Sequence, residues 1–191
     1  MNSFYSQEEL KKIGFKSLGQ NILISRKASV YGAKNISIGN NVRIDDFCIL
    51  SGKITLGNHI HISAYSSIFA GNAGVEFKDF VTFSSRCVVY AVSDDYSGKY
   101  MTNPMLPDKY INVIEKKVVL NKHCIVGTNS TILPGVELAE GVSIGAMSLV
   151  NKSLPAWGIY VGIPVKKIKE RSKQLLELEK EFLEIGENIE Q

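Results

Sequence analysis

The chain has 191 residues, of which 45% are hydrophobic and 21% are charged, so a single domain with a sizeable core is expected and the composition gives no sign of disorder. Its 22 Lys and Arg against 19 Asp and Glu give a net charge of +3, too balanced for a nucleic-acid-binding arm. No apolar run approaches the roughly 20 residues of a membrane-spanning helix, and the N-terminus is too polar for a signal peptide. A soluble, cytoplasmic protein without membrane insertion is therefore expected.

Residues 1–20 are predicted to form an N-terminal cap. Ser6-Gln7-Glu8-Glu9 has the spacing of a capping box, in which the Ser6 hydroxyl and the Glu9 carboxylate each accept a free backbone N–H. Gly14 would end this short helix. Because a stack of strands exposes unpaired backbone at its open end, the helix is expected to cover that end.

Aliphatic residues recur every six positions in the ranges 21–89 and 118–164. The two unbroken runs are Ile38, Ile44, Leu50, Leu56, Ile62 and Ile68, then Leu120, Val126, Ile132, Leu138, Ile144 and Val150. A period of six fits neither a helix nor one long alternating strand. It fits short strands joined by sharp corners, three to a triangular coil of about 18 residues, in roughly six stacked coils. The predicted fold is an all-β solenoid.

The three cysteines fit this repeat. Cys48, Cys87 and Cys124 each lie four residues after a core residue of the repeat, at the position where a small side chain points inward. An odd number of cysteines with no CxxC argues against a disulfide framework. Buried free thiols that pack as small hydrophobic groups are expected.

Residues 90–117 interrupt the repeat without following its period. Long insertions of this kind are usually functional loops or disordered segments. The aliphatic residues Ile111, Val113 and Ile114 near its end favour packing. An ordered loop that projects from the coil is therefore predicted.

Residues 165–188 are predicted to form a C-terminal amphipathic helix that begins soon after Pro164. Its apolar residues, at spacings close to 3.6, are Ile168, Leu175, Leu178, Phe182 and Ile185. The helix is expected to pack on the coil or on a neighbouring subunit.

The hexapeptide repeat, the inserted loop and the closing Gly162-Ile163-Pro164 segment resemble the acyl-CoA-dependent transferases with left-handed parallel β-helices. The resemblance implies a homotrimer, with each active site in the groove between two subunits and the long loop reaching over a neighbour. The segments 90–98 and 101–104 are similar to N-acyltransferases of dTDP-4-amino-4,6-dideoxyglucose, which serve surface polysaccharide or glycan synthesis. Acetyl-CoA or another acyl-CoA is thus implied as co-substrate and a dTDP-linked amino sugar as acceptor.

The inserted loop contains no histidine. Galactoside and maltose acetyltransferases carry a catalytic histidine in the corresponding loop, because a sugar hydroxyl needs a base to become a nucleophile. An amine keeps a neutral fraction near pH 7–8 and attacks a thioester without prior deprotonation. The loop therefore favours an amino acceptor.

Four polar residues near the loop are candidates for catalysis and acceptor binding. Asp94 is expected to hold the amino group or a sugar hydroxyl by a charge-assisted hydrogen bond, although Ser93-Asp94-Asp95 also fits an Asx turn. Asp95 and Glu115 are candidates for sugar contact and, alternatively, ordinary surface groups. Ser84, at the end of a predicted strand, is a candidate donor to the thioester or the oxyanion.

The three histidines do not have the paired spacing of the zinc site in carbonic-anhydrase-like β-helices, so no metal is expected. His123 is a candidate general base if its position and the loop converge across a subunit boundary, and otherwise a corner histidine that faces water. With His123 as base, the protein would be an O-acetyltransferase of a sugar or small acceptor. A non-catalytic β-helical scaffold is the third alternative.

The later coils are the expected place for CoA. Gly127, Gly145 and Ala146 would let the backbone approach the pantetheine. The resemblance places the adenine near Gly162 and Pro164. Three lysines are expected to act as point charges near the phosphates: Lys152, Lys166 and Lys169. Taken alone, such a basic cluster is more often a solvated helix start.

Overall fold

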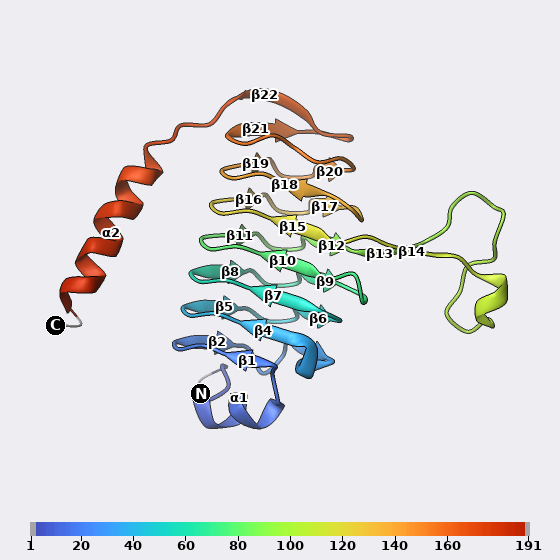
Figure 1. The fold of residues 1–191 in the computed structure, drawn as a ribbon, viewed down its shortest axis with the longest axis horizontal. Helices are drawn as coiled ribbons and strands as arrows, with labels where there is room; N and C mark the ends of the chain where they lie inside the picture. Colours follow the sequence, from blue (N-terminus) through green and yellow to red (C-terminus); the bar gives the residue numbers. More distant parts are fainter. Residues whose placement is uncertain (1–2, 190–191) are drawn as a thin grey trace.

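A computed structural model describes residues 3–189 and shows a stack of triangular coils (Figure 1). Each full coil contributes one short strand to each of three sheets, which run along the stack as its three faces. The predicted all-β solenoid is confirmed, with about seven turns where the repeat predicted roughly six. Residues 1 and 2 of the predicted cap lie outside the described residues.

Three parallel sheets are built over the described residues, numbered here in the order in which the chain meets them. The first sheet contains β1 (Ser17–Leu18), β4 (Ile36–Ile38), β7 (Ile54–Leu56), β10 (Val75–Phe77), β15 (Val118–Leu120) and β18 (Glu137–Leu138). The second sheet contains β2 (Ile22–Ile24), β5 (Val42–Ile44), β8 (Ile60–Ile62), β11 (Thr82–Phe83), β16 (Ile125–Val126), β19 (Ser143–Ile144), β21 (Gly158–Val161) and the antiparallel β22 (Lys166–Glu170). The third sheet contains β3 (Ser29–Tyr31), β6 (Ile49–Ser51), β9 (Ser67–Phe69), β12 (Val88–Tyr90), β17 (Thr131–Ile132) and β20 (Leu149–Val150).

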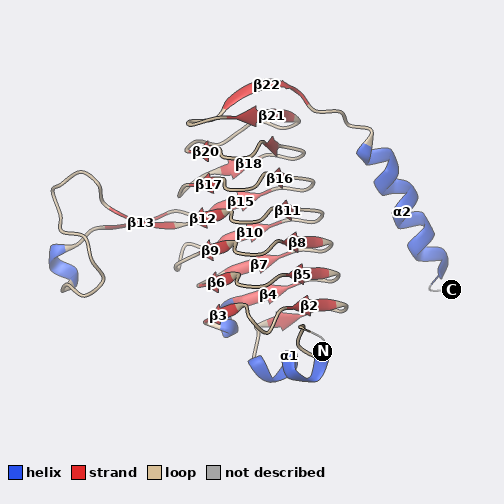
Figure 2. Ribbon diagram, turned by 180° about the vertical axis from the view of Figure 1, so that it is seen from behind, coloured by secondary structure: helices blue, strands red, loops and turns tan. Residues whose placement is uncertain are grey.

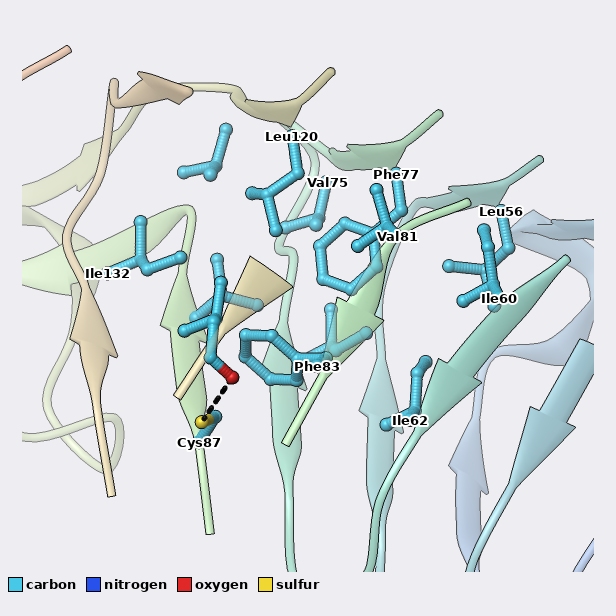
Figure 3. Close-up of a cluster of buried hydrophobic side chains, with 14 of the residues drawn as sticks. Leu56, Ile60, Ile62, Val75, Phe77, Val81, Phe83, Cys87, Leu120 and Ile132 are labelled. Atoms are coloured by element: carbon cyan, nitrogen blue, oxygen red, sulfur yellow. Dashed lines mark hydrogen bonds between the residues drawn. The ribbon is translucent and has the colours of Figure 1, made fainter. Parts of the chain in front are cut away.

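The core is a continuous column of the aliphatic residues that the repeat predicted. Every residue of the two six-residue runs is at most 2% exposed. Ile38 lies beside Leu56 in the first sheet, and Leu120 lies beside Leu138, so like positions stack from coil to coil. Phe77 and Phe83 fill the middle of the stack (Figure 3). Burial of each such side chain stabilises the fold by about 1.5–3 kcal/mol.

The cysteines are buried free thiols, as predicted. Burial raises the pKa of Cys48 to about 11 and that of Cys124 to about 12. Burial also raises the pKa of Cys87, whose thiol donates to a backbone carbonyl of the next coil (Figure 3). At neutral pH these thiols stay protonated and shielded, so they serve packing and not chemistry.

The N-terminal helix α1 (Gln7–Ile13) lies across the open end of the stack (Figure 1). The predicted capping box is present: Glu9 N donates to Ser6 Oγ at 3.3 Å, and Ser6 N donates to Glu9 Oε2 at 2.7 Å. Gly14 ends the helix in the left-handed region with φ 80°. Arg26 pairs with the same glutamate at 2.6 Å, which fastens the cap to the first coil.

The corners of the coils form three edges. The first edge joins the first and second sheets and contains residues 39–41, 57–59, 78–80, 121–123 and 139–141. The second edge joins the second and third sheets and contains residues 45–47, 63–65, 84–86, 127–129 and 145–147. The third edge joins the third and first sheets and contains residues 32–35, 52–53, 70–74, 91–117 and 133–135. The 3-10 turn η1 (Ala33–Asn35) belongs to the third edge.

The insertion leaves the third edge as an antiparallel ribbon of β13 (Val92–Asp94) and β14 (Val113–Glu115). Beyond the ribbon it widens into an ordered loop with the 3-10 turn η2 (Asp108–Tyr110), well clear of the coil (Figures 1 and 2). The loop was predicted to project, but its ribbon was not predicted because each strand has three residues and no clear alternation.

The C-terminal segment differs from the prediction of one helix over 165–188. Residues after Pro164 form β22, which turns back antiparallel along β21, and the helix α2 begins only at Leu175 (Leu175–Ile189). The last coil would otherwise leave an unpaired strand edge, so backbone pairing there outweighs the helical spacing of Ile168. The chain then crosses to the first edge, where α2 runs beside the stack (Figure 2).

Candidate active site

Ser84 lies at the second edge, directly after β11. Its backbone N–H donates to the Val126 carbonyl at 3.0 Å, and its carbonyl accepts from the buried Ser66 hydroxyl at 2.8 Å. Neighbouring coils therefore hold its main chain on both sides. The Ser84 hydroxyl itself has no hydrogen-bond partner among residues 3–189 and is half-buried. It is a free donor on a rigid support.

Asp94 ends β13, at the root of the projecting loop. Its main chain pairs with Val113 in β14, and its carbonyl accepts from the Ser93 hydroxyl at 3.2 Å. The side chain is exposed, and its carboxylate has no partner within the described part of the chain. The ribbon thus presents an unused carboxylate to the outside of the third edge.

Asp95 and Glu115 hold the loop itself. Asp95 accepts from Ser97 N at 2.6 Å and from Asn112 Nδ2 at 2.8 Å, and these hydrogen bonds lower its pKa. The Asx turn of this segment is therefore made by Asp95 and leaves Asp94 free. Glu115 accepts from Asn72 N at 3.2 Å, which ties β14 to the third-edge turn of the preceding coil. Both carboxylates already have structural partners.

His123 lies at the first edge and is 8% exposed, so the alternative of a corner histidine that faces water was wrong. Its ring stacks on Phe80 at 5.1 Å, and its Nε2 is 2.9 Å from Glu179 Oε2 of α2. Arg171 donates to its carbonyl at 2.7 Å. The sequence alone could not show this cover, because it comes from a helix more than 50 residues further along the chain.

Glu179 anchors α2 over the first edge. Burial acts to raise its pKa, but hydrogen bonds from Lys122 and His123 outweigh burial and lower the pKa. A cavity of about 280 Å³ lies between α2 and this edge, and its lining includes Phe80, Leu178 and Phe182. Ser84 and Asp94 do not line it. The hollow under α2 is therefore separate from the two candidates with free side chains.

The candidates for chemistry lie on three different edges of one coil stack. Ser84 is at the second edge, Asp94 at the third and His123 at the first, and each edge separates two faces of the prism. The loop leaves one side of the stack and α2 covers another (Figure 1). One chain by itself therefore does not bring these side chains together.

Gly127 and Gly145 have a packing role that the sequence analysis did not foresee. A Cβ on Gly127 would meet Ala146 N at 2.6 Å, and one on Gly145 would meet Val161 Cγ1 at 2.6 Å. These glycines let successive coils approach one another at the second edge. Their lack of a side chain is explained by the fold, and Ala146 beside them is exposed.

We expect Gly127→Ala to cost about 2–3 kcal/mol of unfolding free energy, because the added methyl group meets backbone that cannot rotate away. Gly145→Ala meets a side chain that can adjust, so we expect a cost of about 1 kcal/mol. Chemical denaturation of both variants measures the difference. Equal costs would contradict this explanation.

The basic residues expected near CoA spread over the last coils. Gly162, with φ 103°, and Pro164 lie where β21 turns towards β22. Lys166 and Lys169 follow on β22, beside Val161 and Ile159 of β21. Lys152 follows β20 at the third edge. All three lysines are exposed and lack an ion-pair partner among residues 3–189, so they can meet phosphate.

No protein-family model matches the sequence. A dTDP-4-amino-4,6-dideoxy-D-glucose acyltransferase from Escherichia coli is 48% identical over 192 residues, covering 98% of this chain and 100% of the relative. The chain belongs to the family of hexapeptide-repeat, acyl-CoA-dependent N-acyltransferases. This membership confirms the resemblance that the repeat and the loop indicated.

Solved structures of this N-acyltransferase family agree closely with the fold. AntD from Bacillus cereus, in complex with dTDP and 3-hydroxybutyryl-CoA, is 57% identical with a TM-score of 0.96, covering 98% of this chain and 100% of that chain. Its S84C variant, in complex with dTDP-4-amino-4,6-dideoxyglucose and coenzyme A, is 58% identical with a TM-score of 0.94, covering 96% and 98%. A D94A variant of AntD was also crystallised. The present chain also has serine at position 84 and aspartate at position 94.

The residues from 3 to 189 also bear on the expected metal and membrane partners. No group of three or more His, Cys, Asp or Glu side chains there is arranged to hold a metal ion. No helix in the described part of this N-acyltransferase is long and apolar enough to cross a bilayer.

Proposed function

We propose that the protein transfers an acyl group, acetyl or a longer one, from acyl-CoA to the amino group of dTDP-4-amino-4,6-dideoxyglucose. The observation that carries this proposal is the full-length similarity to the acyltransferase from Escherichia coli. The AntD complexes with this sugar nucleotide and with coenzyme A support it. The histidine-free loop, with a free carboxylate at its root, supports an amine as the acceptor.

The chemistry needs little from the protein beyond placement. The sugar amine attacks the thioester carbon, a C–N bond forms, and the C–S bond breaks. The proton that the nitrogen loses goes to the departing thiolate. Asp94 holds the amine in line for attack by a charge-assisted hydrogen bond. The Ser84 hydroxyl donates to the oxygen that becomes negative in the tetrahedral intermediate.

The active unit in this proposal is a homotrimer. Because Ser84 and Asp94 lie on different edges of one chain, a site that uses both needs the second edge of one subunit to face the third edge of its neighbour. Closed rotational symmetry repeats such a contact around the axis and gives each subunit both roles. The donor lies along the later coils, with Gly162, Pro164, Lys166 and Lys169 near its nucleotide end.

Release of CoA tests the proposed function. The protein is incubated with acetyl-CoA and dTDP-4-amino-4,6-dideoxyglucose, and free thiol is followed with a chromogenic disulfide. Cys48, Cys87 and Cys124 are buried, so the protein contributes little background. We expect release that depends on the amine, with no release for the 4-hydroxy sugar nucleotide. Failure to bind CoA or to release it would favour the scaffold alternative.

His123→Ala separates N-acylation from O-acylation. We expect kcat/KM to change less than about threefold, because an amine needs no imidazole base. The melting temperature should fall, since the ring packs on Phe80 and pairs with Glu179. An enzyme that used His123 as base would lose about 10²-fold in kcat/KM. Steady-state kinetics and thermal unfolding of the same preparation distinguish the two results.

A further inference from the structure

An exposed ladder of side chains runs along the second edge on the N-terminal side of Ser84. Phe47 and Tyr65 occupy the same corner in successive coils, and their rings stack with centroids 4.9 Å apart and an interplanar angle of 23°. Arg86 takes this corner in the next coil, with its guanidinium carbon 6.0 Å from the Tyr65 ring centroid. We call Phe47, Tyr65 and Arg86 the second-edge ladder. Phe47 is 46% exposed and Tyr65 is 54% exposed.

The backbone of the ladder is sterically unfavourable for its side chains. Phe47, Tyr65 and Arg86 have φ of 60°, 64° and 59°, in the left-handed region that bulky residues rarely adopt. The same corner holds Asn129 in the following coil, and asparagine accepts this conformation far more readily. Large side chains therefore stand at a place where local preference favours a small polar one.

At the first edge, large side chains with positive φ are explained by a segment that packs on them. His59, Phe80 and His123 also have positive φ and also stack, but α2 covers them: the Phe182 ring contacts His59 edge-on at 5.2 Å. Within residues 3–189 nothing comparable covers the second-edge ladder. The exposed rings therefore indicate a binding surface for a partner outside residues 3–189.

The charges around the ladder favour an anionic aromatic ligand. Lys27 lies over the Phe47 ring at 5.3 Å, and it pairs with Asp46 at 3.0 Å, which offsets that carboxylate. Arg86 has no ion-pair partner in the described chain and lies two residues after Ser84. Coils repeat about every 4.8 Å, so the ladder is a strip about 10 Å long that ends at Arg86, in the corner that also contains Ser84.

We infer that the second-edge ladder binds the nucleoside diphosphate part of the acceptor. The pyrimidine stacks on Tyr65 or Phe47, Arg86 contacts the diphosphate, and the sugar reaches Ser84 at the end of the strip. This inference rests on the proposed function and extends it: the donor occupies the coils after Ser84 and the acceptor nucleotide the coils before it. Planar guanidinium groups suit phosphate, and aromatic faces suit bases.

Asparagine substitutions test the ladder without removing the corner conformation. We expect Tyr65→Asn and Phe47→Asn to weaken dTDP binding about tenfold in calorimetry, with melting temperatures unchanged or raised. Tyr65→Phe keeps the stacking ring and should bind dTDP as the unaltered protein does. Arg86→Gln should weaken binding of dTDP and leave binding of thymidine unchanged. Tyr31→Ser removes an exposed ring at the end of β3 in the third sheet and serves as the matched control.

Each outcome of the experiment decides the inference. Wild-type dTDP affinity in Tyr65→Asn, Phe47→Asn and Arg86→Gln would overturn it, and the proposed function would still stand if the unaltered protein acylates the amine. A neighbouring subunit is the other candidate to cover the ladder, and sedimentation of the same variants tests it. If the substitutions dissociate the assembly, the ladder is a subunit contact and the inference is wrong. CoA binding, measured separately, should stay unchanged in all of them.

Discussion

Replacing Asp94 by asparagine should lower kcat/KM for the amino sugar by about 10²-fold, which corresponds to about 2.7 kcal/mol of transition-state stabilisation. The amide keeps the shape of the side chain but loses the charge that holds the amine. Charge-assisted hydrogen bonds are roughly twice as strong as neutral ones, and a misplaced nucleophile loses the benefit of orientation as well. Because the carboxylate is exposed and without a partner within residues 3–189, the substitution should not affect folding.

Asp108→Asn is the matched control for Asp94→Asn. Asp108 lies in the same loop, in the exposed turn η2, and also loses one charge on substitution. We expect its kinetics to match those of the unaltered protein within about twofold, so that general loss of negative charge on the loop is separated from loss of Asp94. If Asp94→Asn kept more than a tenth of kcat/KM, the carboxylate would not hold the acceptor.

Mixed trimers should recover activity that neither variant has alone. Ser84→Ala removes the donor to the oxyanion and should cost about 10²-fold, similar to Asp94→Asn. When the two variants are unfolded together and refolded in equal amounts, a shared site is intact if one subunit supplies Ser84 and its neighbour supplies Asp94. Random assembly gives that arrangement at about a quarter of the sites.

The mixture is compared with each variant refolded alone and with the two refolded separately and then combined. Recovery to about a quarter of full activity in the refolded mixture alone would show that the site is shared between subunits. No recovery would mean that Ser84 and Asp94 of one chain act together, which would require the loop to fold back over its own coil.

The coil could be predicted from the sequence because its constraint is strictly periodic. Each aliphatic residue at the sixth position has one available environment, the interior of the triangle, and Cys48, Cys87 and Cys124 follow from the same geometry. The capping box could be predicted for a similar reason, since its two hydrogen bonds join residues three positions apart. Short-range and periodic rules were enough for these elements.

What escaped prediction depends on contacts between distant segments. β22 pairs with β21 because the last coil needs a partner, although the spacing of Ile168 also fits a helix. His123 is covered by Glu179, which no spacing rule links to it. The roles of Gly127 and Gly145 became visible only when the next coil was in place. The second-edge ladder was not predicted either. The 18-residue coil places Phe47 and Tyr65 at the same corner of successive coils, but the periodic rule was applied only to the inward-facing positions.

The coil continues across the insertion as if the insertion were not there. Phe77 and Leu120 are direct neighbours in the first sheet, and Lys116 N closes the neck of the loop on the Ala91 carbonyl at 2.9 Å. Twenty or more residues can therefore be exchanged beyond that neck while the core keeps its register. The loop can therefore change in sequence and length during evolution while the coil stays folded. A new acceptor specificity then requires a new loop and not a new fold.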